Sequence, residues 1–163
     1  MTMIGAAVIT ASDRSSRGAR TDESGRLLAE LLATVPARLV GARVVPDTVR
    51  SIRGALRAFV RRPEIGLIVT TGGTGVTPRD VTPEATAPLI ERGLPALELA
   101  VRWASWPQAP GTLISRARAG FCGDCLIVNL PGSPRAVREC FTILLPTFRR
   151  LFGGRKGPCP VRG

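Results

Sequence analysis

Three aspartates, Asp13, Asp47 and Asp80, each come shortly after an apolar run that is typical of a β-strand. Mg²⁺ takes one or two carboxylates from a protein and completes its shell with phosphate oxygens of a substrate. A basic chain with three of its five aspartates at such positions is arranged to hold a magnesium–phosphate complex. The alternative is helix capping or turn closure, which explains Asp22 well, could explain Asp47, and suits Asp80 less because Thr82 is the better cap.

A glycine-rich segment, Gly72-Gly73-Thr74-Gly75, lies between the third apolar run and Asp80. Glycines after a buried strand allow backbone amides to approach an anion closely, and this segment leads towards a helix start. The segment is not a P-loop, since no Gly-Lys-Ser/Thr follows, nor a dinucleotide fingerprint, since Pro78 stands at the third glycine position. Two interpretations remain: a phosphate loop, or a sharp turn without a ligand.

The amino-acid composition limits the catalytic mechanisms and the binding partners that are possible for this chain. The chain has no histidine, which excludes a Ser/His/Asp or Cys/His nucleophile, a His-ligated zinc and an imidazole proton shuttle. Its 23 Lys+Arg against 12 Asp+Glu give a net charge of +11, which fits nucleic acid, small anions such as phosphates, or a solvated basic surface. Only 4% of residues are aromatic and no helix-turn-helix spacing occurs, so we expect no nucleic-acid partner. Trp103 and Trp106 are interpreted as core or interface residues.

The cysteines form one closely spaced pair, Cys122 and Cys125. A structural zinc site would need a second such pair, whereas Cys140 falls in the apolar stripe of a predicted helix and Cys159 near the C-terminus. The sequence therefore favours an ordinary turn over a zinc or redox site.

The elements that position these residues alternate between short β-rich runs and amphipathic helices. Strands are predicted at 6–11, 39–45 and 66–70, followed by a strand pair at 112–120 and 125–130. Helices are predicted after Asp22, from Thr48, from Thr82, over 95–106 and from Ser133. This order predicts an α/β domain with a mainly parallel sheet covered on both faces, spanning residues 1–152. Residues 153–163 are predicted to form a basic Gly/Pro-rich tail.

In open α/β sheets, ligands bind beyond the carboxyl ends of the strands. Four segments follow predicted strands directly: SDRSSRG, the Pro46-Asp47 turn, GGTGVTPRD and PGSP. We therefore expect these segments to converge at one edge of the molecule and to form the site there.

No apolar run approaches the roughly 18 residues of a membrane span, and the first residues lack the basic start and cleavage site of a signal peptide. The expectation is a cytoplasmic protein with reduced thiols and no membrane partner.

The chain carries, in this order, TASDRSSRGARTDESG, VVPD, VTTGGTGVTPRDVTPEAT, LISRARAG and IVNLPGSPRAVRECF. This combination resembles the MogA/MoaB family of molybdenum cofactor biosynthesis, which is also similar to the G domain of gephyrin. The resemblance extends from about Ala7 to Phe152. One segment departs from it, because the family usually has Pro-Gly where Pro95-Ala96 stands.

The resemblance implies a three-layer α/β/α sandwich of the molybdopterin-binding type, usually a homotrimer. It implies a molybdopterin adenylyltransferase that uses ATP and Mg²⁺, with the downstream molybdotransferase as a further partner. Asp47 and Asp80 match the catalytic and metal-binding positions. The matching nucleotide and phosphate positions are Gly72, Gly73, Thr74, Gly75, Pro131, Gly132 and Ser133; the matching substrate positions are Ser12, Asp13, Arg14, Ser115 and Arg116.

This chemistry agrees with the composition, because the nucleophile would be a phosphate oxygen that is already ionised, so that no histidine base is needed. Positioning and charge neutralisation would remain, and Arg14, Arg79 and Arg116 all stand in suitable loops. The alternative function is that of a MoaB-like paralogue that binds molybdopterin without turnover.

Overall fold

The structure, a computed structural model, describes residues 3–104, 106 and 110–153. Of the predicted tail, it describes Gly153 alone; residues 154–163 lie outside the described part of the chain.

One six-stranded sheet forms the centre of the fold, in the order β2-β1-β3-β6-β5-β4. The strands are β1 (Ile4–Ala11), β2 (Ala37–Val45), β3 (Ile65–Thr71), β4 (Arg92–Gly93), β5 (Ala119–Cys122) and β6 (Cys125–Leu130). β2, β1, β3 and β6 pair in parallel, and β5 pairs antiparallel with both of its neighbours. The predicted mainly parallel sheet is confirmed.

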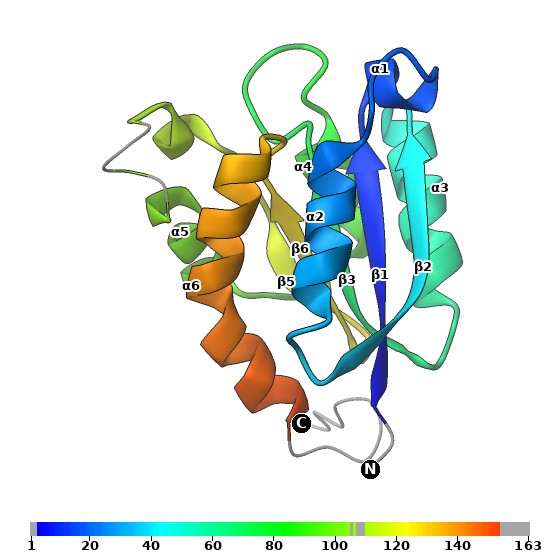
Figure 1. The fold of residues 1–163 in the computed structure, drawn as a ribbon, viewed down its shortest axis with the longest axis vertical. Helices are drawn as coiled ribbons and strands as arrows, with labels where there is room; N and C mark the ends of the chain where they lie inside the picture. Colours follow the sequence, from blue (N-terminus) through cyan, green and yellow to red (C-terminus); the bar gives the residue numbers. More distant parts are fainter. Residues whose placement is uncertain (1–2, 105, 107–109, 154–163) are drawn as a thin grey trace.

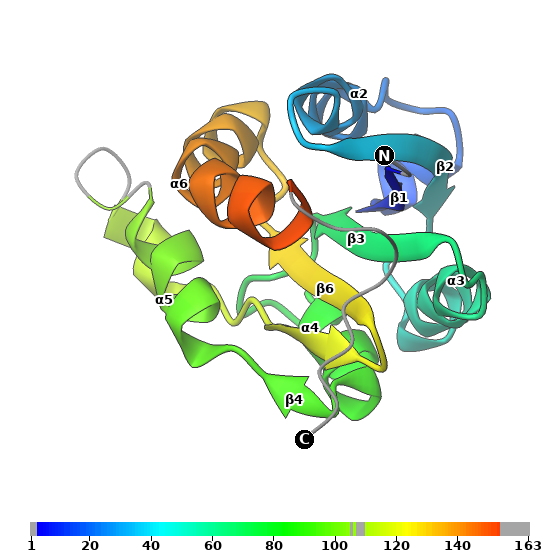
Figure 2. The ribbon, with the colours of Figure 1, turned by 90° about the horizontal axis from the view of Figure 1, so that it is seen from below.

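Helices cover both faces of this sheet. They are α1 (Asp13–Ser16), α2 (Glu23–Leu32), α3 (Val49–Val60), α4 (Thr82–Thr86), α5 (Pro95–Trp103) and α6 (Pro134–Phe152), with 3₁₀ turns η1 (Ala87–Leu89) and η2 (Pro110–Ile114). Figures 1 and 2 show α2 and α6 on one face and α3 and α4 on the other. α5 contributes Val101 to the same core as α2 and α6. The result is the expected three-layer α/β/α sandwich.

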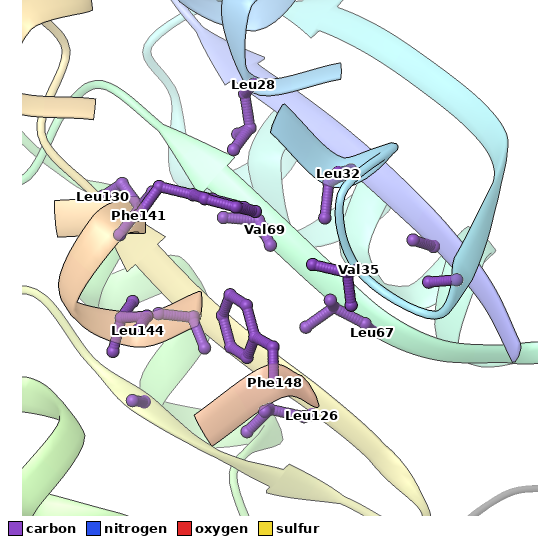
Figure 3. Close-up of a cluster of buried hydrophobic side chains, with 14 of the residues drawn as sticks. Leu28, Leu32, Val35, Leu67, Val69, Leu126, Leu130, Phe141, Leu144 and Phe148 are labelled. Atoms are coloured by element: carbon purple, nitrogen blue, oxygen red, sulfur yellow. The ribbon is translucent and has the colours of Figure 1, made fainter. Parts of the chain in front are cut away.

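The larger core lies between the sheet and the layer of α2 and α6. Figure 3 shows Leu28 and Leu32 of α2 and Phe141 and Phe148 of α6 gathered over Leu67 and its neighbours on the central strands. These side chains are fully buried, and each contributes about 1.5 to 3 kcal/mol relative to an exposed position. β1, β3 and β6 are buried at every residue because helices cover both of their faces, whereas β2 is a largely exposed edge strand.

The predicted helix starts at Asp22, Thr48 and Ser133 are confirmed. Each side chain accepts a hydrogen bond from the backbone N–H group three residues further along the chain, at 2.9, 3.2 and 3.2 Å respectively. The start predicted at Thr82 is different: Val81 occupies the N-cap position without a side-chain cap, and the Thr82 hydroxyl donates to the Gly72 carbonyl at 2.8 Å. The Thr82 side chain thus stabilises the glycine-rich segment 72–75, which we call the glycine loop. The sequence pattern did not reveal this contact.

The prediction of a strand over 112–120 is wrong for residues 112–118. Residues Pro110–Ile114 form η2, and β5 begins only at Ala119. The intervening chain instead contacts the glycine loop, where the Arg116 N–H donates to the Thr74 carbonyl at 2.8 Å. The helix predicted over 95–106 ends at Trp103, in keeping with the bias against helical backbone at Trp106, which precedes Pro107. α1, β4 and η1 were not predicted.

From β1 the chain passes to β2 on one side and then returns to β3 on the other side of β1. The sheet therefore has a topological switch point between β1 and β3. The connections that leave the carboxyl ends of β1 and β3 therefore diverge and leave a crevice, the usual place for a ligand in such sheets. In Figure 1, α1 and the loop after β3 stand together at this end of the sheet.

Candidate functional site

A cavity of about 230 Å³ opens at this switch point. It is lined from the carboxyl ends of β1, β2, β3 and β6, and we call it the carboxylate cavity. Its lining residues are Thr10, Ala11, Ser12, Ser15, Arg20, Thr21, Asp22, Glu23, Ser24, Asp47, Thr71, Gly72, Gly73, Arg79, Asp80 and Gly132. Asp47 and Asp80, predicted from the sequence as a pair, line the same cavity.

Two reciprocal hydrogen bonds with Asp13 fix the position of Asp47. The Asp13 N–H donates to the Asp47 carboxylate at 2.8 Å, and the Asp47 N–H donates to the Asp13 carboxylate at 3.0 Å. This exchange joins the end of β1 to the end of β2. The bond from the Asp47 N–H, with the Arg79 guanidinium paired to Asp13, lowers the pKa of Asp13. Burial raises the pKa of Asp47, and the negative charges of Asp13 and Asp80 add to this increase.

Asp80 closes the loop that follows β3. Its carboxylate accepts from the N–H of Thr77 at 2.9 Å and from the Thr77 hydroxyl at 2.6 Å. Turn closure, the alternative that suited Asp80 less well by sequence, is therefore present. The glycines of the loop bring backbone against both carboxylates: a Cβ on Gly75 would lie 2.8 Å from Asp80 Oδ2, and one on Gly73 would lie 3.5 Å from Asp47 Oδ1.

The residues fit a magnesium ion that arrives with a polyphosphate. Two carboxylates line one cavity, and the charge of Asp80 raises the pKa of Asp47, so a cation between them would be favoured. Within residues 3–104, 106 and 110–153, no cluster of three or more Cys, Asp or Glu side chains could hold a metal. Two carboxylates plus substrate oxygens is the mode of Mg²⁺ binding rather than that of a dedicated metal cage.

A second cavity, of about 350 Å³, lies on the other side of Gly132. Hydroxyl side chains and apolar residues line it, and we call it the hydroxyl cavity. Its lining residues are Thr74, Gly75, Gly111, Thr112, Ile114, Ser115, Pro131, Gly132, Ser133, Arg135, Ala136 and Glu139. The predicted nucleotide and substrate residues are thus divided: Ser12, Gly72 and Gly73 line the carboxylate cavity, Thr74, Gly75, Ser115, Pro131 and Ser133 line the hydroxyl cavity, and Gly132 lines both. The predicted substrate residues Asp13, Arg14 and Arg116 line neither cavity.

Thr74 carries an unusual hydroxyl. The residue is only 5% exposed, yet its side chain makes no hydrogen bond within the described part of the chain. Ser115, 9% exposed, accepts one bond from the Ala117 N–H at 3.3 Å. A buried hydroxyl without a partner costs free energy, so its retention at a cavity wall is typical of a group that meets a ligand.

The wall between the cavities is built from backbone held at close range. The Ser24 hydroxyl donates to the Gly132 carbonyl and the Thr71 hydroxyl to the Pro131 carbonyl, both at 2.7 Å. A Cβ on Gly132 would lie 3.2 Å from the Cα of Gly72. Gly72 itself has a φ of 94°, and a Cβ there would clash with the Ala11 carbonyl. Only glycine fits at Gly72, where β1, β3 and β6 come together.

The glycine loop offers backbone donors. Gly72 and Gly73 have positive φ angles of 94° and 64°. Among the described residues, the N–H groups of Gly73, Thr74 and Gly75 find no protein acceptor. Successive unpaired amides in such a turn form a concave site for an anion, which favours the phosphate-loop interpretation.

The predicted arginines have separate positions. Arg116 donates from Nε to the Gly75 carbonyl at 2.7 Å and from Nη2 to the Asp80 carbonyl at 2.6 Å, and it pairs with Glu84. Arg79 lines the carboxylate cavity and pairs with Asp13. Arg14 is exposed and lines neither cavity.

Among the lining residues of the carboxylate cavity that sequence reasoning missed are Thr10, Arg20, Ser24 and Thr71. Thr10 and Thr71 are paired in register on β1 and β3. The available signal was a polar residue near the carboxyl end of each apolar run. Arg20 and Ser24 are brought in by the connection from α1 to α2, and no local pattern marks them.

The closely spaced cysteines behave as an ordinary hairpin. Cys122 and Cys125 are cross-strand partners of β5 and β6, and both are free thiols. Burial raises the pKa of Cys125 to about 12 and also raises that of Cys122. Neither thiol is readily ionised at neutral pH, in keeping with the interpretation as a turn.

The described helices include none with the length and hydropathy needed to cross a membrane. Trp103 and Trp106 are 51% and 36% exposed and lie edge to face with ring centroids 5.8 Å apart. They are therefore not core residues, and an interface is the interpretation that remains.

Comparison with known proteins gives a consistent result. The chain is 41% identical over 150 residues to the molybdenum cofactor synthesis protein cinnamon of Drosophila melanogaster, covering 90% of this chain but 25% of the relative. It is 36% identical over 141 residues to a molybdopterin adenylyltransferase of Helicobacter pylori, covering 85% of this chain and 80% of the relative. The chain thus spans only about a quarter of cinnamon but most of the bacterial enzyme.

Among solved structures, the molybdopterin biosynthesis enzyme MoaB of Thermus thermophilus superposes with a TM-score of 0.84 at 37% identity, covering 93% of this chain and 98% of that one. Residues 7–150 match the sequence family described as probable molybdopterin binding domain. With the fold, the paired carboxylates and these likenesses in agreement, the chain belongs to this family of molybdopterin-binding domains of molybdenum cofactor biosynthesis.

Proposed function

We propose that this protein is a molybdopterin adenylyltransferase that uses ATP and Mg²⁺. The observation that carries the proposal is the meeting of two cavities at Gly132, one lined by Asp47 and Asp80 and the other by hydroxyl groups. Two phosphate-bearing substrates that occupy the two cavities would meet beside the unpaired amides of the glycine loop. The Helicobacter pylori relative carries the name of this activity.

In the proposed reaction, a phosphate oxygen of molybdopterin attacks the α-phosphorus of ATP. A new P–O bond forms, the bond to the β-phosphate breaks, and the products are adenylyl-molybdopterin and pyrophosphate. The attacking oxygen is ionised at neutral pH, so the chain needs no general base and its lack of histidine is no obstacle.

The residues then have positioning and electrostatic tasks. Asp47 and Asp80 would hold Mg²⁺, which supplies charge neutralisation at the triphosphate when bound. Asp13 keeps Asp47 in place through their reciprocal hydrogen bonds, and Thr77 does the same for Asp80. The N–H groups of Gly73, Thr74 and Gly75 would donate to phosphate oxygens whose charge grows as the bond breaks.

The hydroxyl cavity would bind one substrate through its phosphate and its flat ring. Thr74, Ser115 and Ser133 bring hydroxyl donors, and Ile114 and Pro131 bring apolar walls. Such a combination of a few polar groups with apolar surface is usual for small-molecule sites.

The test is direct: purified protein is incubated with molybdopterin, ATP and Mg²⁺, and adenylyl-molybdopterin and pyrophosphate are quantified. We expect both products in equal amounts, and neither without Mg²⁺. If calorimetry shows molybdopterin binding while no ATP is consumed, the protein is instead the binding paralogue without turnover.

We further propose a homotrimer as the working form, located in the cytoplasm, with the downstream molybdotransferase as the recipient of the product. Support for self-association comes from exposed apolar side chains around α5 and η2, among them Leu99, Trp103, Leu113 and Ile114. Exposed apolar groups on neighbouring elements are typical of interfaces. Light scattering coupled to gel filtration would measure the mass, and a monomer at micromolar concentration would contradict the trimer.

A further inference from the structure

We propose that Arg20 binds the phosphate of a substrate in the carboxylate cavity. This inference rests on the proposed function, and it concerns a residue to which neither the sequence motifs nor the family resemblance assigned a role. It follows from how the arginines around the site are engaged.

The Arg116 guanidinium is engaged in hydrogen bonds and an ion pair within the protein. Its guanidinium bridges the carbonyls of Gly75 and Asp80 and pairs with Glu84, while its own N–H donates to Thr74. A planar guanidinium that bridges several oxygens holds a loop in one shape. Arg116 is therefore a positioning residue, because it fixes the backbone that carries Asp80.

Arg79 and Arg14 are also poor candidates for the phosphate contact. Arg79 lines the carboxylate cavity but is paired with Asp13, and that pair supports the carboxylate that holds Asp47. A substrate phosphate at Arg79 would compete with Asp13 for the same guanidinium. Arg14 lines neither of the two cavities.

Arg20 differs from all three. It lies between α1 and α2, is exposed, and lines the carboxylate cavity. No hydrogen bond or ion pair joins its side chain to any residue in the described part of the chain. Of the two arginines that line this cavity, Arg20 is the one whose whole guanidinium is open to a substrate, whereas Arg79 is shared with Asp13.

The carboxylate cavity has several acidic lining residues, and Arg20 brings a positive charge close to them. Asp22, Glu23, Asp47 and Asp80 line the cavity and repel an anionic substrate. Arg20 offsets part of this repulsion at the cavity wall. A guanidinium also matches phosphate geometrically, since two of its N–H groups can donate to two oxygens at once.

The ligand chemistry is a phosphate group, which either ATP or molybdopterin could supply. Steady-state kinetics distinguish the two sources, because loss of the contact raises the KM of the substrate that carries the bound phosphate. Direct titration of the protein with Mg-ATP and with molybdopterin gives the same distinction without turnover.

The experiment compares Arg20→Gln with Arg26→Gln as a control. Arg26 is an exposed residue of α2 that lines neither cavity, and its substitution removes the same charge. For Arg20→Gln we expect the KM and the Kd of one substrate to rise about tenfold, with kcat within about twofold of wild type. Arg20→Lys should recover part of the loss, and Arg26→Gln should change affinity by less than about twofold.

The inference is overturned if Arg20→Gln binds both substrates as Arg26→Gln does. Failure of the proposed function has a different signature: wild type forms no product, while the titrations still report whether Arg20 affects binding.

Discussion

The two cavities on either side of Gly132 are built from different chemistry. The carboxylate cavity contains Asp47 and Asp80, whose positions are fixed by hydrogen bonds from backbone N–H groups. The hydroxyl cavity has no aspartate among its lining residues and contains Thr74, Ser115 and Ser133 beside apolar groups. Aspartates therefore gather in one cavity, whereas in the other the hydroxyl and apolar groups lie beside the ion pair of Arg135 and Glu139.

This difference indicates a division of labour. Fixed carboxylates can hold a cation at the point where phosphate charge changes, and so can affect the rate of a reaction. Neutral hydroxyls and apolar walls recognise a substrate that is bound in the same way before and during the reaction, and so affect affinity. The comparison predicts that substitutions of the carboxylates Asp47 and Asp80 change kcat, whereas substitutions of the hydroxyl groups in the other cavity change KM.

The largest effect is expected for Asp80→Asn. The Asn side-chain oxygen can still accept from Thr77, so the loop should keep its shape while the negative charge is lost. We expect kcat to fall about a hundredfold or more, with an unchanged melting temperature. A variant that unfolds, or one that turns over normally, would contradict the assignment of Asp80 to the reaction rather than to the turn.

A smaller effect, on affinity, is expected for Thr74→Val in the hydroxyl cavity. Valine has the same shape as threonine, and the lost hydroxyl has no partner within the described residues, so stability should be unchanged or slightly higher. We expect the KM of one substrate to rise about tenfold with little change in kcat. Equal KM values for variant and wild type would show that this hydroxyl meets no ligand.

Ser24→Ala probes the wall that the two cavities share. It removes the 2.7 Å bond to the Gly132 carbonyl and should lower the free energy of unfolding by about 1 kcal/mol. Because Gly132 lines both cavities, kcat and KM should change together and modestly. Thermal melts and kinetics on Ser24→Ala and on Ser24→Thr, which retains a hydroxyl, measure this. A change in only one constant would mean that the cavities are not coupled through this wall.

The smallest effect at neutral pH is a proton competition at Asp47. Burial raises the pKa of this carboxyl, so on acidification it takes up a proton, and loses its hold on Mg²⁺, at a higher pH than an ordinary aspartate would. Asp13 does not cause this loss, because the hydrogen bond from the Asp47 N–H lowers its pKa. Activity should therefore decline on the acid side, and added Mg²⁺ should shift the decline to lower pH. A decline that is independent of Mg²⁺ concentration would assign it to another group.

Much of the fold could be predicted because local patterns and tertiary structure agree. Helix caps at Asp22, Thr48 and Ser133 are local signals, and β3 and β6 are continuous apolar runs covered on both faces. The strand prediction failed over residues 112–118, where η2 forms and Arg116 hydrogen-bonds to the carbonyls of Thr74 and Gly75 in the glycine loop. Such long-range hydrogen bonds have no periodicity that a sequence can show.

The amino-acid sequence by itself determined the alternation of strands and helices and the chemical inventory of the site. It placed Asp47, Asp80 and the glycine loop after strands whose carboxyl ends must share one edge, and it excluded histidine chemistry. Tertiary structure alone decided the rest: that Gly132 separates two cavities, that Asp13 and Asp47 exchange hydrogen bonds, and that Arg116 holds a loop while Arg20 faces no partner. The physical reason is that such contacts join residues far apart in the chain, and only the packing of the elements brings them together.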